Sequence, residues 1–155
     1  MNSVSSFRQL RSLFPKGGFT KLGGNDIYNY MNSMYDLSAL DKIIYDDNMC
    51  CAVHTSNKEL IVFPKEYTYN VLNLTHKDLQ LVKHLKKVGT KLVSYSTPQG
   101  VSSEKYMYFL PHPHNTLSWL NMIVLTEPSY EMDPLGVSID VVIDSLRDES
   151  MAYIP

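Results

Sequence analysis

The order of apolar and polar positions along the chain changes from a strand-like to a helix-like pattern. Between residues 42 and 63, short apolar runs are separated by two polar turns, 46–48 and 55–58. Apolar runs of this length, bounded by Asp, Asn and Ser, are typical of strands joined by tight turns. The pattern predicts an antiparallel meander of strands 42–45, 49–54 and 59–63. Pro64 lacks a backbone N–H donor and is expected to end the third strand.

A helical pattern follows this meander. Thr75 and Asp78 have the spacing of a capping box, in which each side chain accepts a hydrogen bond from a free backbone amide. Apolar residues then recur every three or four positions on one face, with lysines opposite. They are Leu79, Val82, Leu85, Val88 and Leu92, against Lys83, Lys86 and Lys87. The same spacing predicts helices over 26–40 and 137–146, with a short helical stretch at 7–14.

Two more apolar stretches, 105–110 and 119–126, are short and are predicted to be strands. The sequence therefore predicts an α+β domain with one five-stranded antiparallel sheet and two principal helices. Gly and Pro residues interrupt the first 25 positions. We expect residues 1–40 to form an N-terminal extension containing an amphipathic helix, and residues 41–150 to form the domain itself.

Composition is that of an ordinary globular domain. A chain of 155 residues with 44% hydrophobic and 19% charged residues can bury a core. The formal charge of -2 gives no electrostatic reason to expect duplex nucleic acid or a membrane surface as a partner. No apolar run approaches the ~18 residues that span a bilayer, and residues 1–20 lack the apolar core of a signal peptide. The only cysteines, Cys50 and Cys51, are adjacent, which favours an intracellular location, cytoplasmic or nuclear.

A small basic cluster precedes the first acidic residue, Asp26. It consists of Arg8, Arg11, Lys16 and Lys21. We expect it to be a solvated arm, with contact to phosphate as the alternative.

Most of the compact polar chemistry lies in residues 109–118, just before the predicted strand 119–126. This stretch contains His112, His114, Asn115, Thr116 and Ser118. A polar loop at the mouth of a buried strand places side chains on a rigid support. It is therefore the first candidate for a functional site.

Four segments carry a resemblance to a known family: residues 42–54 (KIIYDDNMCCAVH), 60–67 (LIVFPKEY), 73–79 (NLTHKDL) and 136–146 (GVSIDVVIDSL). The first is similar to the opening hairpin of the histidine-triad (HIT) superfamily of nucleotide hydrolases and transferases. The second resembles that family's Pro-Lys strand end, with Tyr67 where histidine is usual. The last resembles the late helix of the scavenger mRNA decapping branch. The resemblance spans about residues 41 to 147 and implies a HIT-like fold and a homodimer.

The chain departs from this family at its defining motif, three histidines alternating with apolar residues on the last strand. Trp119, Asn121 and Ile123 stand at those positions. The family's middle histidine forms a covalent nucleotidyl intermediate, which an amide side chain cannot do. The resemblance further places Thr116 at a phosphate-contacting serine, and Thr55 where an acidic ribose ligand is common.

The resemblance thus implies a catalytically degenerate domain, without a cofactor. We expect it to bind a nucleotide, a cap-like dinucleotide or a protein partner without hydrolysis. Its nucleotide-binding residues would be Val53, His54, Ser56, Asn115, Thr116 and Asn121.

Two enzymatic alternatives stay open. His112 and His114 could replace the missing triad from the loop, one attacking a phosphoryl group and the other donating a proton. Alternatively, His54-x-Ser56 and His114-x-Thr116 fit the pattern of two-histidine phosphodiesterases, in which two imidazoles act as acid and base.

A metal site is not expected. A structural zinc site needs four ligands and a catalytic one needs three plus water. His54, His76 and His84 lie in separate predicted elements, and the chain has no Cys-x-x-Cys pair.

Overall fold

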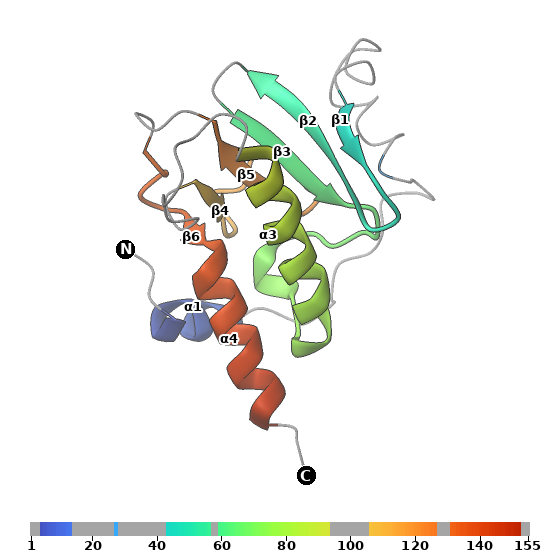
Figure 1. The fold of residues 1–155 in the computed structure, drawn as a ribbon. Coiled ribbons are helices and arrows are strands. Elements are labelled where there is room, and N and C mark those ends of the chain that lie inside the picture. The colour runs from blue at the N-terminus through green and yellow to red at the C-terminus, as the bar shows by residue number, and fades with distance from the viewer. Residues whose placement is uncertain are drawn as a thin grey trace.

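The computed structural model describes residues 4–13, 27, 43–56, 59–93, 106–126 and 131–152. In chain order its elements are α1 (Val4–Ser12), β1 (Ile43–Asp46), β2 (Cys50–Ser56), β3 (Glu59–Pro64), η2 (Val71–Asn73), η3 (His76–Asp78), α3 (Leu79–Val93), β4 (Met107–Phe109), β5 (Met122–Leu125), β6 (Val137–Ser138) and α4 (Ile139–Ala152). Figure 1 shows one sheet with α3 and α4 lying across the same face. None of the described helices is long and apolar enough to cross a membrane.

The sheet is antiparallel throughout, with the strand order β1-β2-β3-β5-β4-β6. This confirms the α+β class and the predicted meander. The predicted number of five strands is wrong, because Val137 and Ser138 pair with Phe109 and Tyr108 as a sixth strand. The helix predicted to begin at residue 137 therefore begins at Ile139 and continues to Ala152.

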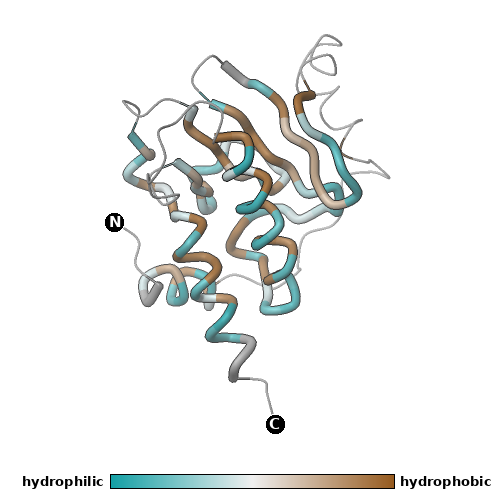
Figure 2. The backbone as a smooth tube through the Cα atoms, in the orientation of Figure 1, coloured by the Kyte–Doolittle hydropathy of each residue, from teal (hydrophilic) through white to brown (hydrophobic). Residues whose placement is uncertain are grey.

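The main core lies between the sheet and the two long helices. Ala52, Val62 and Met122 form one cross-strand row of this face, and each is fully buried. A Cβ at Gly89 of α3 would lie only 2.5 Å from Sδ of Met107 and 2.7 Å from Cε of Met122. Close approach of the helix to the sheet thus depends on the missing side chain at Gly89. Figure 2 shows the hydrophobic central strands and the alternation of hydrophobic and hydrophilic residues along α3.

Helix α3 begins as the sequence predicts. Thr75 caps η3, its hydroxyl accepts a hydrogen bond from the amide of Lys77, and the Asp78 carboxylate accepts one from the amide of Thr75. Val82, Leu85 and the other apolar residues of this face are buried or partly buried against the main core. The capping box thus fixes where the chain turns into α3.

The opposite face of the sheet has its own apolar cluster. It contains Ile27, Cys51, Val53, Ile61, Phe63, Leu117 and Trp119, with Ile43 and Tyr67 packed against it. Alternate residues of a strand point to opposite faces, which is why Cys50 belongs to the main core and Cys51 to this second cluster. The predicted helix 26–40 lies outside the described residues except for Ile27, which is helical and buried.

Strand β5 is shorter than the predicted strand 119–126. It begins at Met122, and Trp119 to Asn121 precede it. The amide of Leu120 donates instead to the carbonyl of Thr68 at 2.6 Å. Residues 119–121 therefore pack against the segment after β3 rather than extending the ladder.

Helix α1 is part of the folded domain. Phe7 is buried in the main core, and Arg11 is 1% exposed. The Arg11 guanidinium lies 2.8 Å from the Glu149 carboxylate on α4 and also donates to Ser145 and to the carbonyl of Leu74. The expected solvated arm is therefore wrong for Arg11. Lys16 and Lys21, from the same predicted cluster, lie outside the described residues.

Candidate functional site

The polar loop before β5 is anchored by a buried asparagine. Asn70 is 3% exposed, and its Oδ1 accepts hydrogen bonds from the amides of Leu72 and His112 at 3.2 and 3.1 Å. Its Nδ2 donates to the carbonyl of Leu110. One side chain thus joins the segment after β3 to the beginning of the loop, and gives the loop a rigid base.

The two loop histidines have different environments. His112 is half-buried, and its Nδ1 shares a 2.9 Å hydrogen bond with the hydroxyl of Tyr69. His114 is exposed, and its backbone amide donates to the carbonyl of Pro111. His112 is therefore positioned by the protein, whereas the imidazole of His114 faces solvent.

The three positions of the expected triad do not form a polar site. Trp119 is 1% exposed, and Ile123 is 7% exposed. The Trp119 indole meets Tyr67 edge-on, with ring centroids 5.0 Å apart. Asn121 is half-buried, and its Nδ2 donates to the carbonyl of Trp119. Trp119 is a core residue, which agrees with the simplest interpretation of a single tryptophan in an apolar run.

The other predicted binding residues are scattered. Val53 is 3% exposed within the second cluster. Ser56 is the last residue of β2. Asn115 donates to the carbonyl of Leu117, and Thr116 is exposed on the loop. Of this set, only Asn115 and Thr116 lie together on an accessible surface with His114.

His54 lies away from this loop. It is exposed on β2 and pairs with Leu60. The loop instead reaches the other end of the hairpin, where the Trp119 indole donates to the carbonyl of Pro64, the strand partner of Cys50. Cys50 and His54 are four positions apart along β2, which is roughly 13 Å. The loop that carries the His114-x-Thr116 motif is therefore anchored at the end of the hairpin opposite His54.

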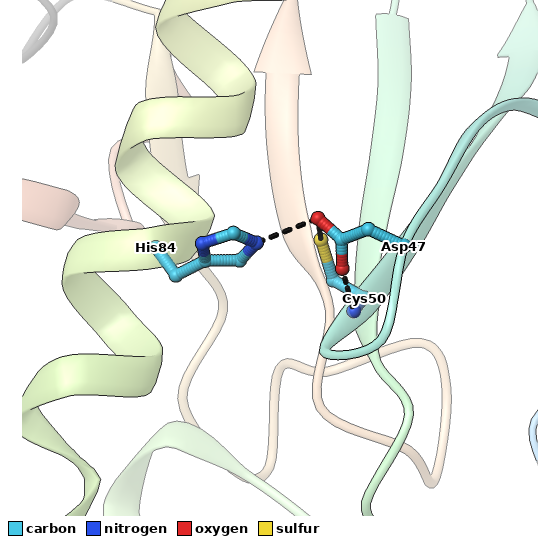
Figure 3. A group of neighbouring side chains, drawn as sticks. All are labelled: Asp47, Cys50 and His84. Atoms are coloured by element: carbon cyan, nitrogen blue, oxygen red, sulfur yellow. Dashed lines mark hydrogen bonds and ion pairs between the residues drawn. The ribbon is translucent and has the colours of Figure 1, made fainter.

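A second group of chemically active side chains lies at the turn between β1 and β2 (Figure 3). Oδ1 of Asp47 accepts hydrogen bonds from the amides of Met49 and Cys50 at 2.7 and 2.9 Å. Oδ2 accepts from the hydroxyl of Tyr45 and from Nε2 of His84, both at 2.7 Å. The sequence explains the turn, because an Asp at this position commonly bonds the amides that follow it.

Cys50 completes this group. Its thiol is fully buried and lies 3.9 Å from Oδ2 of Asp47. One ligand atom from each of Asp47, Cys50 and His84 lies within 4.8 Å of the others. Figure 3 shows one carboxylate oxygen of Asp47 directed toward both the imidazole on α3 and the thiol on β2. The group therefore joins the hairpin to the helix.

The electrostatics of this group follow from its contacts. Burial acts to raise the pKa of Asp47, but hydrogen bonds from Tyr45, Met49, His84 and Cys50 outweigh it and hold the pKa well below its usual value. Burial, together with the negative charge of Asp47, raises the pKa of the Cys50 thiol to about 12. The group therefore holds a carboxylate and a protonated thiol near neutral pH.

Only part of this site can be predicted from the order of residues along the chain. Asp47 was predicted to be a turn residue, and His84 lies next to Leu85 on a helix with a predicted apolar face. Their separation of 37 residues has no characteristic spacing. The turn and the helix meet only because the sheet packs under α3.

Among the hollows of the described part of the chain, two on the helical side are lined mainly by basic residues. One, of about 400 Å³, is lined by Arg8, Arg11, Ser12, Thr75, His76, Lys77 and Glu149. The other, of about 320 Å³ between α3 and α4, is lined by Lys83, Lys86, Lys87, Thr90, Ile143 and Arg147. Part of their positive charge is compensated, since Arg8 pairs with Asp148 and Lys86 with Asp140. Neither hollow is lined by the predicted nucleotide-binding residues.

The fold and its sites define a class: an α+β domain with an antiparallel sheet, long helices on one face and a polar loop before β5. Comparison with known proteins adds no closer identity. No family model matches the chain, and no curated protein matches it.

Proposed function

We propose that this protein is a histidine-triad-like binding domain that binds a nucleotide or cap-like dinucleotide without hydrolysing it. The observation that carries this proposal is the environment of the three triad positions. Trp119 and Ile123 are 1% and 7% exposed among apolar neighbours, and Asn121 supplies only an amide. An attacking group and a proton donor for the leaving group are both missing from these three side chains.

The loop before β5 supplies the polar groups for binding. Thr116 offers a hydroxyl and His114 an imidazole at the surface, beside the half-buried Asn115. Hydroxyl, amide and imidazole groups can each donate a hydrogen bond to a phosphate oxygen. The anchor provided by Asn70 limits the conformational entropy that the loop would lose when a ligand binds.

The test combines a binding assay with a hydrolysis assay. Cap analogue, dinucleoside polyphosphate and adenosine phosphoramidate are titrated by calorimetry, and the products are separated by chromatography. We expect binding of at least one phosphate-bearing ligand, and no turnover above the blank. Robust turnover that disappears in His112→Ala or His114→Ala would instead establish catalysis relocated to the loop.

A matched pair of variants locates the ligand. Thr116→Val should weaken binding about tenfold, the effect of one lost hydrogen bond to a charged group. Thr90→Val, in the basic hollow between α3 and α4, should leave the affinity unchanged. The reverse result would place the ligand in that hollow and contradict the proposed site.

A protein partner is the second candidate, favoured by exposed apolar side chains at β1 and the turn that follows it. Strand β1 ends the described strand order, and Ile44 within it and Met49 in the turn that follows are each 39% exposed. A second copy of the chain could pair with this edge and form the homodimer that the resemblance implies. Light scattering should then show a dimer that Ile44→Lys dissociates. Leu135→Lys, at an apolar residue 48% exposed elsewhere, is the control and should leave the dimer intact.

A further inference from the structure

We propose that Asp47, Cys50 and His84 form a binding site for Zn²⁺, with a water molecule as the fourth ligand. The three residues supply a carboxylate oxygen, a thiolate sulfur and an imidazole nitrogen, all of which bind zinc in proteins. They come from the β1–β2 turn, the first residue of β2 and the middle of α3. A bound ion would therefore link the hairpin to the helix.

The distances require only small movements. Tetrahedral zinc with ordinary bond lengths separates its nitrogen and oxygen ligands by about 3.4 Å, and its sulfur and oxygen ligands by about 3.5 Å. Nε2 of His84 and Oδ2 of Asp47 lie 2.7 Å apart, while Sγ of Cys50 and Oδ2 lie 3.9 Å apart. These two separations each change by less than about 1 Å, and Nε2 of His84 and Sγ of Cys50, which lie within 4.8 Å of each other, approach by at most about 1.3 Å to reach tetrahedral geometry. Side-chain rotation on a fixed backbone can supply movements of this size.

The surroundings orient the carboxylate. The amides of Met49 and Cys50 hold Oδ1 of Asp47 and leave Oδ2 toward the thiol and the imidazole. The Tyr45 hydroxyl donates to Oδ2 and would remain as an outer partner of the bound ligand. Such partners fix the geometry of a metal ligand and strengthen binding.

Access and proton balance also fit. The side chains of His84 and Asp47 are 25% and 24% exposed, which gives solvent a route to the site and a place for the fourth ligand. Binding replaces the S–H bond of Cys50 with a Zn–S bond and releases that proton to solvent. The proton on Nε2 of His84 moves to Nδ1, so that Nε2 presents its lone pair.

The donor set distinguishes zinc from the common hard cations. Mg²⁺ and Ca²⁺ prefer six or more oxygen ligands, whereas this group offers one carboxylate beside a sulfur and a nitrogen. The competing explanation is that the Asp47–His84 hydrogen bond simply holds the hairpin against α3. A purely structural bond of that kind would not respond to a metal ion, so the two explanations are experimentally separable.

The experiment titrates the chelator-treated protein with Co²⁺ as a spectroscopic substitute for zinc, followed by competition with Zn²⁺. We expect a thiolate-to-cobalt charge-transfer band, its loss on adding Zn²⁺, and release of one proton per ion. Cys50→Ser should remove the band. His84→Gln, at a partly exposed residue that can be replaced without emptying the core, should weaken Zn²⁺ binding by at least about a hundredfold, more than the loss of an outer partner.

Cys51→Ser is the matched control, since the neighbouring thiol lies in the cluster on the opposite face of the sheet. It should keep both the band and the affinity. Absence of the band in the natural protein would overturn the proposal. Equal loss of the band in the Cys51 and Cys50 variants, or unchanged zinc affinity in a folded His84→Gln protein, would overturn it as well.

Discussion

The indole Nε1 of Trp119 donates a 2.9 Å hydrogen bond to the carbonyl of Pro64. This bond satisfies the one polar atom of a side chain that is otherwise buried in an apolar cluster. Position 119 is therefore built as part of the core. The consequence for function is that a catalytic group cannot be added there without loss of stability.

The first prediction concerns restoration of the triad. Asn121→His should fold and stay inactive, because Trp119 and Ile123 cannot hold the imidazole tautomer or handle the leaving-group proton. The triple change Trp119→His, Asn121→His, Ile123→His supplies those groups but removes two buried apolar side chains. It should destabilise the protein by several kcal/mol, on the order of 3–5 for an aromatic truncated to alanine and less where imidazole fills the space.

Thermal melts and a cap-analogue hydrolysis assay on both variants test this prediction. Multiple turnovers by the single Asn121→His variant would show that the assignment of the triad positions is wrong.

A second prediction follows from the lowered pKa of Asp47. A carboxyl group whose pKa is lower in the folded than in the unfolded state stabilises the fold above its unfolded pKa, and this stabilisation is lost as pH falls. Asp47→Asn should therefore lower the free energy of unfolding by about 2 kcal/mol at pH 7, which is the usual contribution of hydrogen bonds to a charged group. The difference from the natural protein should shrink below about pH 4.

Urea unfolding at several pH values measures this difference. Asp144→Asn, at a surface pair whose side chains are 54% exposed, is the control and should change stability by less than about 0.5 kcal/mol. A difference at Asp47 that stays constant down to pH 2 would contradict the assigned role of the charge.

The third prediction concerns the two thiols. Burial raises the pKa of Cys50 and of Cys51 to about 12. Because the thiolate is the reactive form, both should react with a thiol reagent at pH 8 about a thousandfold more slowly than an unfolded cysteine. The absorbance of the reagent's product, followed over time with chelator present, gives the reaction rate of the folded protein without denaturant and of the unfolded protein with denaturant. A fast-reacting thiol in the folded protein would show that one of them is accessible and activated.

The fourth prediction separates two arginines on α1. Arg11→Met removes the guanidinium that pairs with the Glu149 carboxylate and donates to the Leu74 carbonyl. It should lower the free energy of unfolding by about 2–3 kcal/mol, less than for a fully buried pair, because Glu149 is partly solvated. Arg8→Met breaks a pair with Asp148 whose side chains are 52% and 60% exposed. It should cost less than about 1 kcal/mol. Equal effects in chemical unfolding would mean that α1 does not depend on the buried pair.

Features determined by neighbouring residues could be predicted from the sequence. The meander from β1 to β3 follows from short apolar runs with Asp, Asn and Ser between them. The capping box of Thr75 and Asp78 and the apolar face of α3 follow from spacing within a few residues. These preferences act over one or two turns of chain, so they are visible without a partner.

Other features depend on partners far along the chain. Val137 and Ser138 have no strand signal of their own and become β6 because Phe109 and Tyr108 present an open edge. Asp47 meets His84 across 37 residues, and Arg11 meets Ser145 across 134. Such pairs form when the sheet packs against α3 and α4. Burial of apolar surface drives this packing, and it brings polar side chains from distant segments close enough to form hydrogen bonds. Local preferences of the chain therefore account for the class of fold and its first strands, whereas packing between distant segments selects the polar groups that share a site.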